Sequence, residues 1–233
     1  MQSSDINIAE NIKFVREQIA EAAIKSGRIP DDIKLVAVTK TKPVDCVREA
    51  IAATVDAIGE NRVQEMLEKR SQNAYVGAPL HFIGHLQSNK VSKVVGVCDL
   101  IESVSSKTLV ELIGRKAVSL GIVQDILIEV NIGREPQKSG IMPEETEEVL
   151  AVASLTEGVR VLGLMTIPPI NNKKVTNCNY YDTMFKLFVD ISTKKYDNVS
   201  VRLLSMGMSD SYIDAIHAGS NMVRIGSALF GKR

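Results

Sequence analysis

The sequence predicts an α/β fold: a closed (β/α)8 TIM barrel in one domain over residues 1–233, with an extra helix ahead of the first strand. Short apolar or β-branched runs alternate eight times with helical stretches, which is typical of this barrel. The runs are apolar almost throughout, as expected for parallel strands covered on both faces. The turn after the first run, residues 40–43, contains no glycine. This disfavours the alternative architecture, an open doubly wound sheet with a Gly-rich first turn.

The expected elements follow from hydrophobic periodicity. Residues from about 7 to 26 have apolar side chains at helical spacing, and Gly27 ends this N-terminal helix. The expected strands are 35–39, 55–58, 80–83, 100–104, 125–131, 159–165, 201–204 and 222–225. The expected helices between them are 44–53, 63–73, 88–95, 106–120, 143–155, 176–193 and 209–218. Pro143 suits a first helical turn, and Ser209-Asp210 is typical of an N-cap.

The composition excludes several classes of function. Basic and acidic residues number 28 each, so the chain lacks the excess positive charge of a nucleic-acid or anionic-membrane binder. No apolar run approaches the roughly 20 residues of a membrane span. Cys46, Cys98 and Cys178 are far apart and form no C-x-x-C motif, which indicates a reducing, cytoplasmic location. His81 and His85 lie in a strand-then-turn segment, so no metal site is expected.

Lys40 is the most informative single residue. It follows the apolar run 35–39, at the carboxyl end of the expected first strand. Desolvation there favours the neutral amine, and a neutral amine can form a Schiff base with a carbonyl compound. From this residue alone, a side chain that snorkels out to solvent is an open alternative.

The turns after the last two strands predict a phosphate site. Ser209 lies in the first turn, and Gly226 and Ser227 lie in the second. Barrels of this kind often bind phosphate after strands seven and eight, where main-chain N–H groups at a helix start hold an anion. Arg224 shares a strand face with Met222 and is expected to point into the barrel. Asn61, after the second strand, is either a polar lining group or a helix cap.

Longer strings carry a resemblance to a known family. They are Val38-Thr39-Lys40-Thr41-Lys42-Pro43, Gly59-Glu60-Asn61, His81-Phe82-Ile83-Gly84, Leu86-Gln87-Ser88-Asn89-Lys90, Lys138-Ser139-Gly140, Gly163-Leu164-Met165, Ser205-Met206-Gly207-Met208-Ser209-Asp210 and Val223-Arg224-Ile225-Gly226. From about residue 7 to residue 231 the chain resembles the YggS/PROSC family, the pyridoxal phosphate homeostasis proteins. That family is similar in fold to the N-terminal barrel domain of alanine racemase.

The resemblance implies a cofactor and a set of site residues. Lys40 would form a Schiff base with pyridoxal 5′-phosphate (PLP), and Arg224 would face its pyridine nitrogen. The other residues implied are Ser209, Gly226 and Ser227 at the phosphate, Asn61, Met165 and Met206 along the pocket, and Lys138 in a secondary role in cofactor transfer. The resemblance also implies a cytoplasmic monomer, with apo forms of PLP enzymes as candidate partners.

Two functions remain open on the sequence. One is a PLP-binding protein of PLP homeostasis without robust turnover, and the other is a PLP-dependent amino-acid racemase. An arginine at the pyridine nitrogen weakens the electron sink, which is compatible with racemisation. Racemisation also needs a second proton donor, and no tyrosine here lies in a matching motif. The sequence therefore favours the binding protein. A barrel for a different phosphorylated ligand, with Lys40 as a charge partner, is the third alternative.

Overall fold

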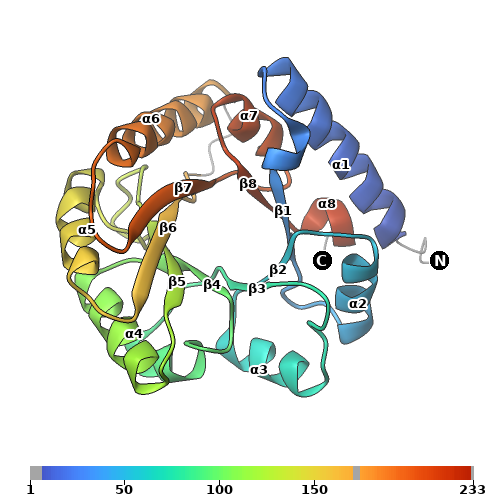
Figure 1. Ribbon diagram of the computed structural model, residues 1–233. Helices are drawn as coiled ribbons and strands as arrows, with labels where there is room; N and C mark the ends of the chain where they lie inside the picture. The colour runs from blue at the N-terminus through green and yellow to red at the C-terminus, as the bar shows by residue number, and fades with distance from the viewer. Residues whose placement is uncertain (1–6, 170–173, 232–233) are drawn as a thin grey trace.

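Eight parallel strands close into a barrel in sequence order in the computed structural model, which describes residues 7–169 and 174–231 (Figure 1). The ring closes between the first and last strands, where Lys34 pairs with Met222 and Ala37 with Ile225. The strands are β1 (Lys34–Val38), β2 (Ala57–Glu60), β3 (Leu80–Phe82), β4 (Leu100–Val104), β5 (Gln124–Glu129), β6 (Val159–Met165), β7 (Val199–Ser205) and β8 (Met222–Ile225). The predicted fold class is confirmed, and all eight strands are present, with the second at Ala57–Glu60 instead of the predicted 55–58.

The helices surround this ring. They are α1 (Ile8–Lys25), α2 (Val44–Ala52), α3 (Val63–Ser71), α4 (Lys107–Ser119), α5 (Thr146–Ser154), α6 (Lys174–Ser192), α7 (Tyr212–His217) and α8 (Ser227–Phe230), with 3₁₀ helices η1 (Pro30–Asp32), η2 (Ser88–Lys93) and η3 (Pro143–Glu145). The prediction of an α-helix over 88–95 is wrong: the segment is the 3₁₀ helix η2. Its serine, asparagine and valine residues are weak α-helix formers. Pro143 begins a 3₁₀ turn that leads into α5.

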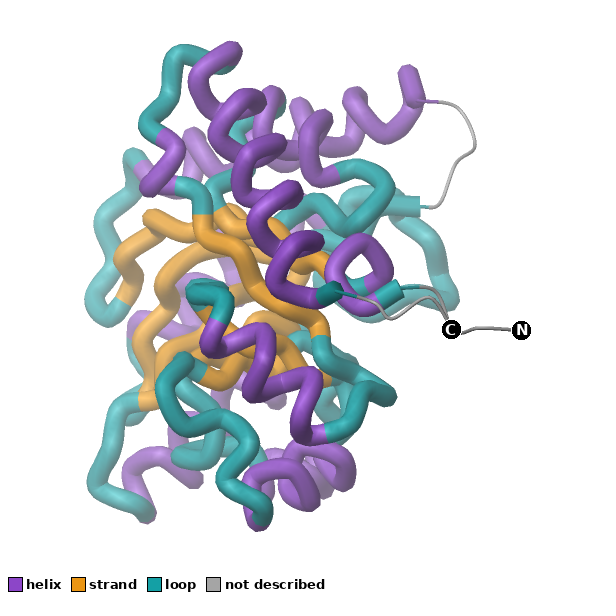
Figure 2. Tube along the Cα trace, turned by 90° about the vertical axis from the view of Figure 1, so that its right-hand side faces the viewer, coloured by secondary structure: helices purple, strands orange, loops and turns teal. Residues whose placement is uncertain are grey.

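The N-terminal helix α1 is confirmed, and it packs against α2, α7 and α8 beside the closure of the barrel (Figures 1 and 2). Asn7 caps it by accepting a hydrogen bond from Glu10 N. Asn11 Nδ2 donates to Leu229 O over 2.9 Å, and Arg28 Nη1 donates to Ser220 O over 2.7 Å. These contacts anchor α8 and the turn before β8. No helix of the described residues has the length and apolar character needed to cross a membrane.

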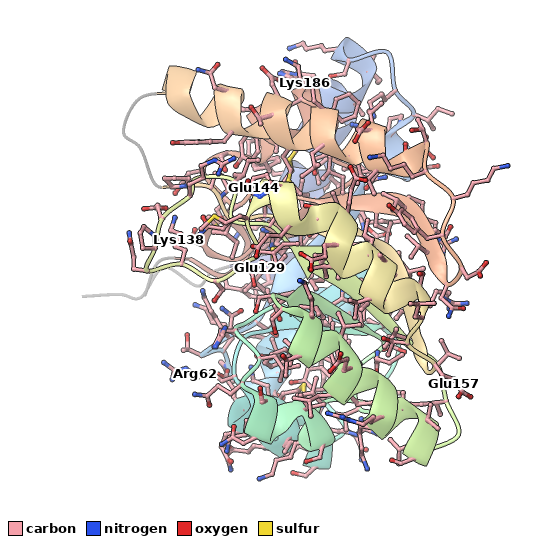
Figure 3. The ribbon with its side chains drawn as sticks, turned by 90° about the vertical axis from the view of Figure 1, so that its left-hand side faces the viewer. Arg62, Glu129, Lys138, Glu144, Glu157 and Lys186 are labelled. Atoms are coloured by element: carbon pink, nitrogen blue, oxygen red, sulfur yellow. The ribbon has the colours of Figure 1, made fainter. Side chains whose placement is uncertain are left out.

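The barrel interior has two layers, because alternate strand residues point to opposite sides of the wall. The lower layer is apolar and contains Val36, Ala57, Leu100, Leu127, Leu162, Met165 and Met222. Toward the carboxyl ends, the same face carries polar side chains: His81, Glu102, Glu129, Ser205 and Arg224. All five are buried. In Figure 3, Arg62 and Lys138 mark the carboxyl end, Glu129 lies deeper, and Glu157 lies at the opposite end.

Candidate functional site

A cavity of about 520 Å³ opens at the carboxyl ends of the strands. Small-molecule sites typically enclose 300–1,000 Å³, so its size suits one cofactor-sized ligand. Six residues predicted from the sequence line it together: Lys40, Asn61, Ser209, Arg224, Gly226 and Ser227. They come from the ends of β1, β2, β7 and β8, where catalytic and binding residues of this barrel type collect.

Lys40 lies on the turn between β1 and α2, two residues beyond the strand end, and is half-buried. Thr41 follows it with a positive φ of 63°. Lys42 Nζ donates to Phe230 O over 2.8 Å, which joins this turn to α8. The loop therefore connects the lysine side of the pocket to the side where the phosphate site is predicted.

Arg224 is the buried cation of the pocket, with 3% of its surface exposed. Its Nη2 donates to Thr166 O over 2.9 Å, and its Nη1 donates to Ser205 Oγ. Burial lowers the pKa of Arg224, and the negative charges of Glu102 and Glu129 oppose this shift. A guanidinium stays protonated at neutral pH, so Arg224 presents a fixed positive charge.

Glu102 is the counterion of Arg224. Its Oε2 lies 3.9 Å from Arg224 Nη1 and accepts a 2.6 Å hydrogen bond from Ser205 Oγ. Its Oε1 lies 2.7 Å from His81 Nδ1. Burial alone would raise the pKa of Glu102. The hydrogen bond and charge of His81, the charge of Arg224 and the Ser205 hydroxyl together hold it below its ordinary value. Glu102 is therefore ionised at neutral pH.

Glu129, at the end of β5, is the second carboxyl group of this interior layer (Figure 3). It is 6% exposed, and its Oε2 receives no hydrogen bond from the described residues. Burial raises its pKa to about 7, while the charge of Arg224 acts in the opposite direction. Unlike Glu102, Glu129 takes up a proton near neutral pH.

The turns after β7 and β8 meet at Ser209. Its Oγ accepts hydrogen bonds from Gly226 N and Ala228 N, each over 3.2 Å. The prediction that Ser209 caps the helix over 209–218 is therefore wrong: α7 begins at Tyr212, and Ser209 caps α8 instead. Two main-chain N–H groups at the start of α8 therefore converge on one oxygen beside the pocket, and such converging donors also suit an anion.

Asn61 places at the pocket a hydrogen-bond acceptor without a donor among the described residues. It lines the pocket, and its buried Oδ1 receives no hydrogen bond from any described residue. Its main chain lies so close to Gly84 that a Cβ at Gly84 would be 2.1 Å from Asn61 O. A buried acceptor without a donor is destabilising by itself, so this oxygen suits a ligand hydroxyl or N–H group.

Three predicted residues do not line this pocket. Met165 lies in the apolar layer inside the barrel, and Met206 points outward into the core between the barrel and the helices. Strand alternation explains Met206, because its neighbour Ser205 faces inward. Lys138 lies on the loop after β5, where its Nζ contacts Glu135 Oε2 at 2.5 Å and Pro168 O at 3.2 Å.

The sequence prediction missed the carboxylates behind Arg224. Glu102 is two residues after Leu100, and Glu129 is two after Leu127, so each shares the inner face of its strand with an apolar residue. An acid at an inward position of an apolar strand is the pattern that could have identified them. No group of three or more His, Cys, Asp or Glu able to hold a metal occurs within the described ranges.

The comparisons with known proteins agree with this fold. The family model described as "Alanine racemase, N-terminal domain" matches residues 7–233. An alanine racemase structure from Clostridium difficile 630 has a TM-score of 0.73 at 20% identity, covering 96% of this chain and 57% of that one. The chain is thus a barrel of the alanine racemase N-terminal type.

Closer relatives define the family. A "Pyridoxal phosphate homeostasis protein" of Aquifex aeolicus is 39% identical over 98% of this chain and 99% of its own length. The protein of that name from Escherichia coli K12 is 37% identical over 97% of each chain. PipY of Synechococcus elongatus, solved with PLP bound, has a TM-score of 0.84 at 30% identity and covers 97% of this chain and 100% of its own. The chain belongs to the pyridoxal phosphate homeostasis protein family.

Proposed function

We propose that this chain is a PLP-binding protein of intracellular PLP homeostasis that holds the cofactor through a Schiff base at Lys40. The observation that carries the proposal is that Lys40, Arg224 and the Ser209–Gly226 contact all open into one cavity. The names of the relatives and the PLP-bound PipY support it. Residues 1–233 would then act as a single PLP-binding domain.

The residues of the pocket fit the groups of PLP. The Ser227 hydroxyl supplies a donor for a phosphate, and the N–H groups of Gly226 and Ala228, which donate to Ser209 Oγ in the structure, become donors when a phosphate takes the place of that oxygen. Arg224 supplies a charged donor that suits an unprotonated pyridine nitrogen. The orphaned Asn61 Oδ1 suits a hydroxyl. When bound, PLP supplies an aldehyde for the lysine amine and a ring that can accept electrons.

Met165, Met206 and Lys138 have other places in this proposal. Met165 supports the pocket from below, and Met206 shapes the turn after β7 from the core side. Lys138, with 28% of its side chain exposed, lies on the loop after β5. We assign it the secondary role in PLP transfer, outside the pocket.

Binding without robust turnover is the activity that the pocket favours over racemisation. Lys40 can move a proton on one side of a bound substrate. Among the described residues that line the pocket there is no tyrosine, cysteine or histidine for the other side, and the one carboxyl group, Asp210, is exposed. The second lysine of the lining, Lys42, donates to Phe230 O. A racemase needs two such groups. The relatives' name, homeostasis protein, agrees with binding.

We expect the protein to act as a monomer in the cytoplasm, with apo forms of PLP enzymes as its partners. Its balanced charge of 28 basic and 28 acidic residues offers no basis for binding nucleic acid or an anionic membrane. Cys46 and Cys98 are both free thiols in the structure, which suits a reducing compartment.

The test is a visible spectrum of the pure protein with and without added PLP, followed by borohydride reduction and peptide mass analysis. We expect a pyridoxyl adduct on Lys40, its loss in Lys40→Ala, and its retention in Lys42→Ala, the matched lysine of the same pocket. An unmodified Lys40 in PLP-treated protein would favour the different phosphorylated ligand. Rapid, multiple-turnover racemisation of an amino acid by the pure protein would contradict the binding role.

A further inference from the structure

A buried ionic network lies on the outer side of the barrel wall, directly behind the loop that carries Lys40. At its centre is Lys69 of α3, which is 5% exposed. Its Nζ donates to Glu60 Oε1, Glu65 Oε1 and Thr39 O, each over 2.7 Å. An ammonium group has three N–H donors, so all of them are used. Neither Lys69 nor Glu60 lines the pocket itself.

The network holds the chain on both sides of Lys40. Before it, Thr39 O accepts from Lys69, and Thr39 Oγ1 donates to Glu60 Oε1 over 2.7 Å. After it, Thr41 N donates to Glu65 Oε1 over 2.5 Å. One ammonium thus connects both neighbours of Lys40, the first directly and the second through Glu65.

The chain at this point needs such support. Thr41 is β-branched, yet it has a φ of 63°, in the left-handed region that β-branched residues rarely adopt. Backbone strain of this kind persists only where surrounding contacts determine the conformation. The hydrogen bond from Thr41 N to Glu65 is one such contact. The turn it maintains leaves Lys40 and Lys42 lining the pocket, while the Thr39 side chain faces away from the pocket, toward Glu60.

We propose that Lys69 is a positioning residue, which acts through Thr39 and Glu65 to fix the turn of residues 39–41 so that Lys40 points into the pocket. The inference rests on the proposed function, because it assigns Lys69 a part in capturing PLP at Lys40. Lys69 does not touch the ligand. It sets the geometry from which the Lys40 amine attacks the aldehyde carbon, with loss of water.

Stability alone gives a weaker account of this network. A buried ion pair pays a desolvation penalty that well-packed apolar residues avoid. Glu60 carries that penalty: burial raises its pKa against the hydrogen bonds from Lys69 and Thr39. Its Oε2 also receives no hydrogen bond from the described residues. The three contacts that the network makes to residues 39 and 41 are the feature that apolar packing could not reproduce.

The experiment measures the rate at which PLP becomes trapped on Lys40 by borohydride, in wild type and in Glu65→Ala, at a temperature where both are folded. We expect trapping to slow at least fivefold in Glu65→Ala and to recover in Glu65→Gln, which keeps an acceptor for Thr41 N. Glu68→Ala, on the same helix and exposed, is the matched control and should match wild type. Amide hydrogen exchange of residues 39–42 in the PLP-free protein should be faster in Glu65→Ala than in wild type, and unchanged in Glu65→Gln and Glu68→Ala.

The outcomes separate the two proposals. A wild-type protein that traps no PLP on Lys40 contradicts the proposed function. Trapping in wild type, with equal rates and equal exchange in folded Glu65→Ala, overturns the positioning role alone. A decrease of the trapping rate in Glu68→Ala as large as that in Glu65→Ala also overturns the positioning role. Lys69→Met should slow trapping at least as much as Glu65→Ala. If Lys69→Met does not fold, the Glu65 variants decide the question.

Discussion

The two sides of the barrel wall each carry a buried cation with two carboxylates, but the two networks are built differently. Outside, Lys69 donates all three N–H groups over 2.7 Å, to Glu60, Glu65 and a main-chain carbonyl. Inside, Arg224 stays 3.9 Å from Glu102 and reaches it through Ser205. Each network leaves one carboxylate oxygen without a hydrogen bond from the described residues, Glu60 Oε2 outside and Glu129 Oε2 inside. We call the outer network closed, because every N–H of its cation is used, and the inner network open, because its cation also lines the pocket. The closed network fixes main chain, whereas the open one presents its cation to the pocket.

The closed network should respond most strongly to losing its cation. In Lys69→Met, Glu60 keeps the hydroxyl donors of Thr39 and Tyr75 but loses its buried cation, and loss of one member of a buried ion pair typically costs about 3–5 kcal/mol. We expect a loss of this size in the free energy of unfolding, measured by urea titration at pH 7. The double variant Lys69→Met/Glu60→Gln removes both charges and should recover most of it. A single-variant loss below about 1 kcal/mol would contradict the ionised, buried pair.

The network around Arg224 should make the stability of the protein depend on pH through Glu129. The pKa of Glu129 is about 7 in the folded protein, above its ordinary value of 4.5. Between these values the folded state binds more protons than the unfolded state, so stability falls as pH rises through this window. The shift corresponds to a change on the order of 3 kcal/mol, at 1.36 kcal/mol per pKa unit. Glu129→Gln keeps a neutral group there and should lose this pH dependence.

The measurement is urea unfolding of wild type and Glu129→Gln at several pH values from 5 to 8. The free energy of unfolding of Glu129→Gln should rise relative to that of wild type as the pH rises. Glu102 has the opposite sign: its pKa is lowered, so its contribution is present above its ordinary pKa and is lost as pH falls through the folded value. Parallel curves for wild type and Glu129→Gln would show that Glu129 does not titrate in this range.

The same contrast shows how far sequence reasoning reaches. Strand alternation placed Arg224 on the inner face, and the position of Lys40 at the carboxyl end of an apolar strand singled that residue out; the structure brings both to one cavity. Glu65 lies four residues before Lys69 on the same helix, a spacing that the sequence alone could have indicated. Glu60, Glu102 and Glu129 lie on different elements from the cations they face, and only the packed structure determines which of these acids meets which cation. The resemblance implied Met206 along the pocket, but its neighbour Ser205 faces inward, so the Met206 side chain points into the core outside the barrel.

Ser209 illustrates the limit at a turn. Ser-Asp before a helical stretch is a typical N-cap pattern, and nothing local indicates that the hydroxyl instead accepts from Gly226 N and Ala228 N, 17 and 19 residues away. The donors it binds belong to another turn, which only the closure of the barrel brings close. Local propensity therefore predicted a capping role for Ser209 but assigned it to the wrong helix.

The smallest effect is expected at this turn, which neither network reaches. Ser209→Ala removes the acceptor of two part-buried N–H groups, and loss of such a cap costs about 1 kcal/mol. Because a phosphate can accept from the same N–H groups, added inorganic phosphate or PLP should stabilise Ser209→Ala more than it stabilises wild type.

Urea unfolding with and without phosphate, at constant ionic strength, measures this difference. Ser211→Ala, whose hydroxyl faces Tyr181 and Met208 N, is the control that should show no extra gain. If phosphate does not reduce the difference in the free energy of unfolding between wild type and Ser209→Ala, these N–H groups do not hold the anion.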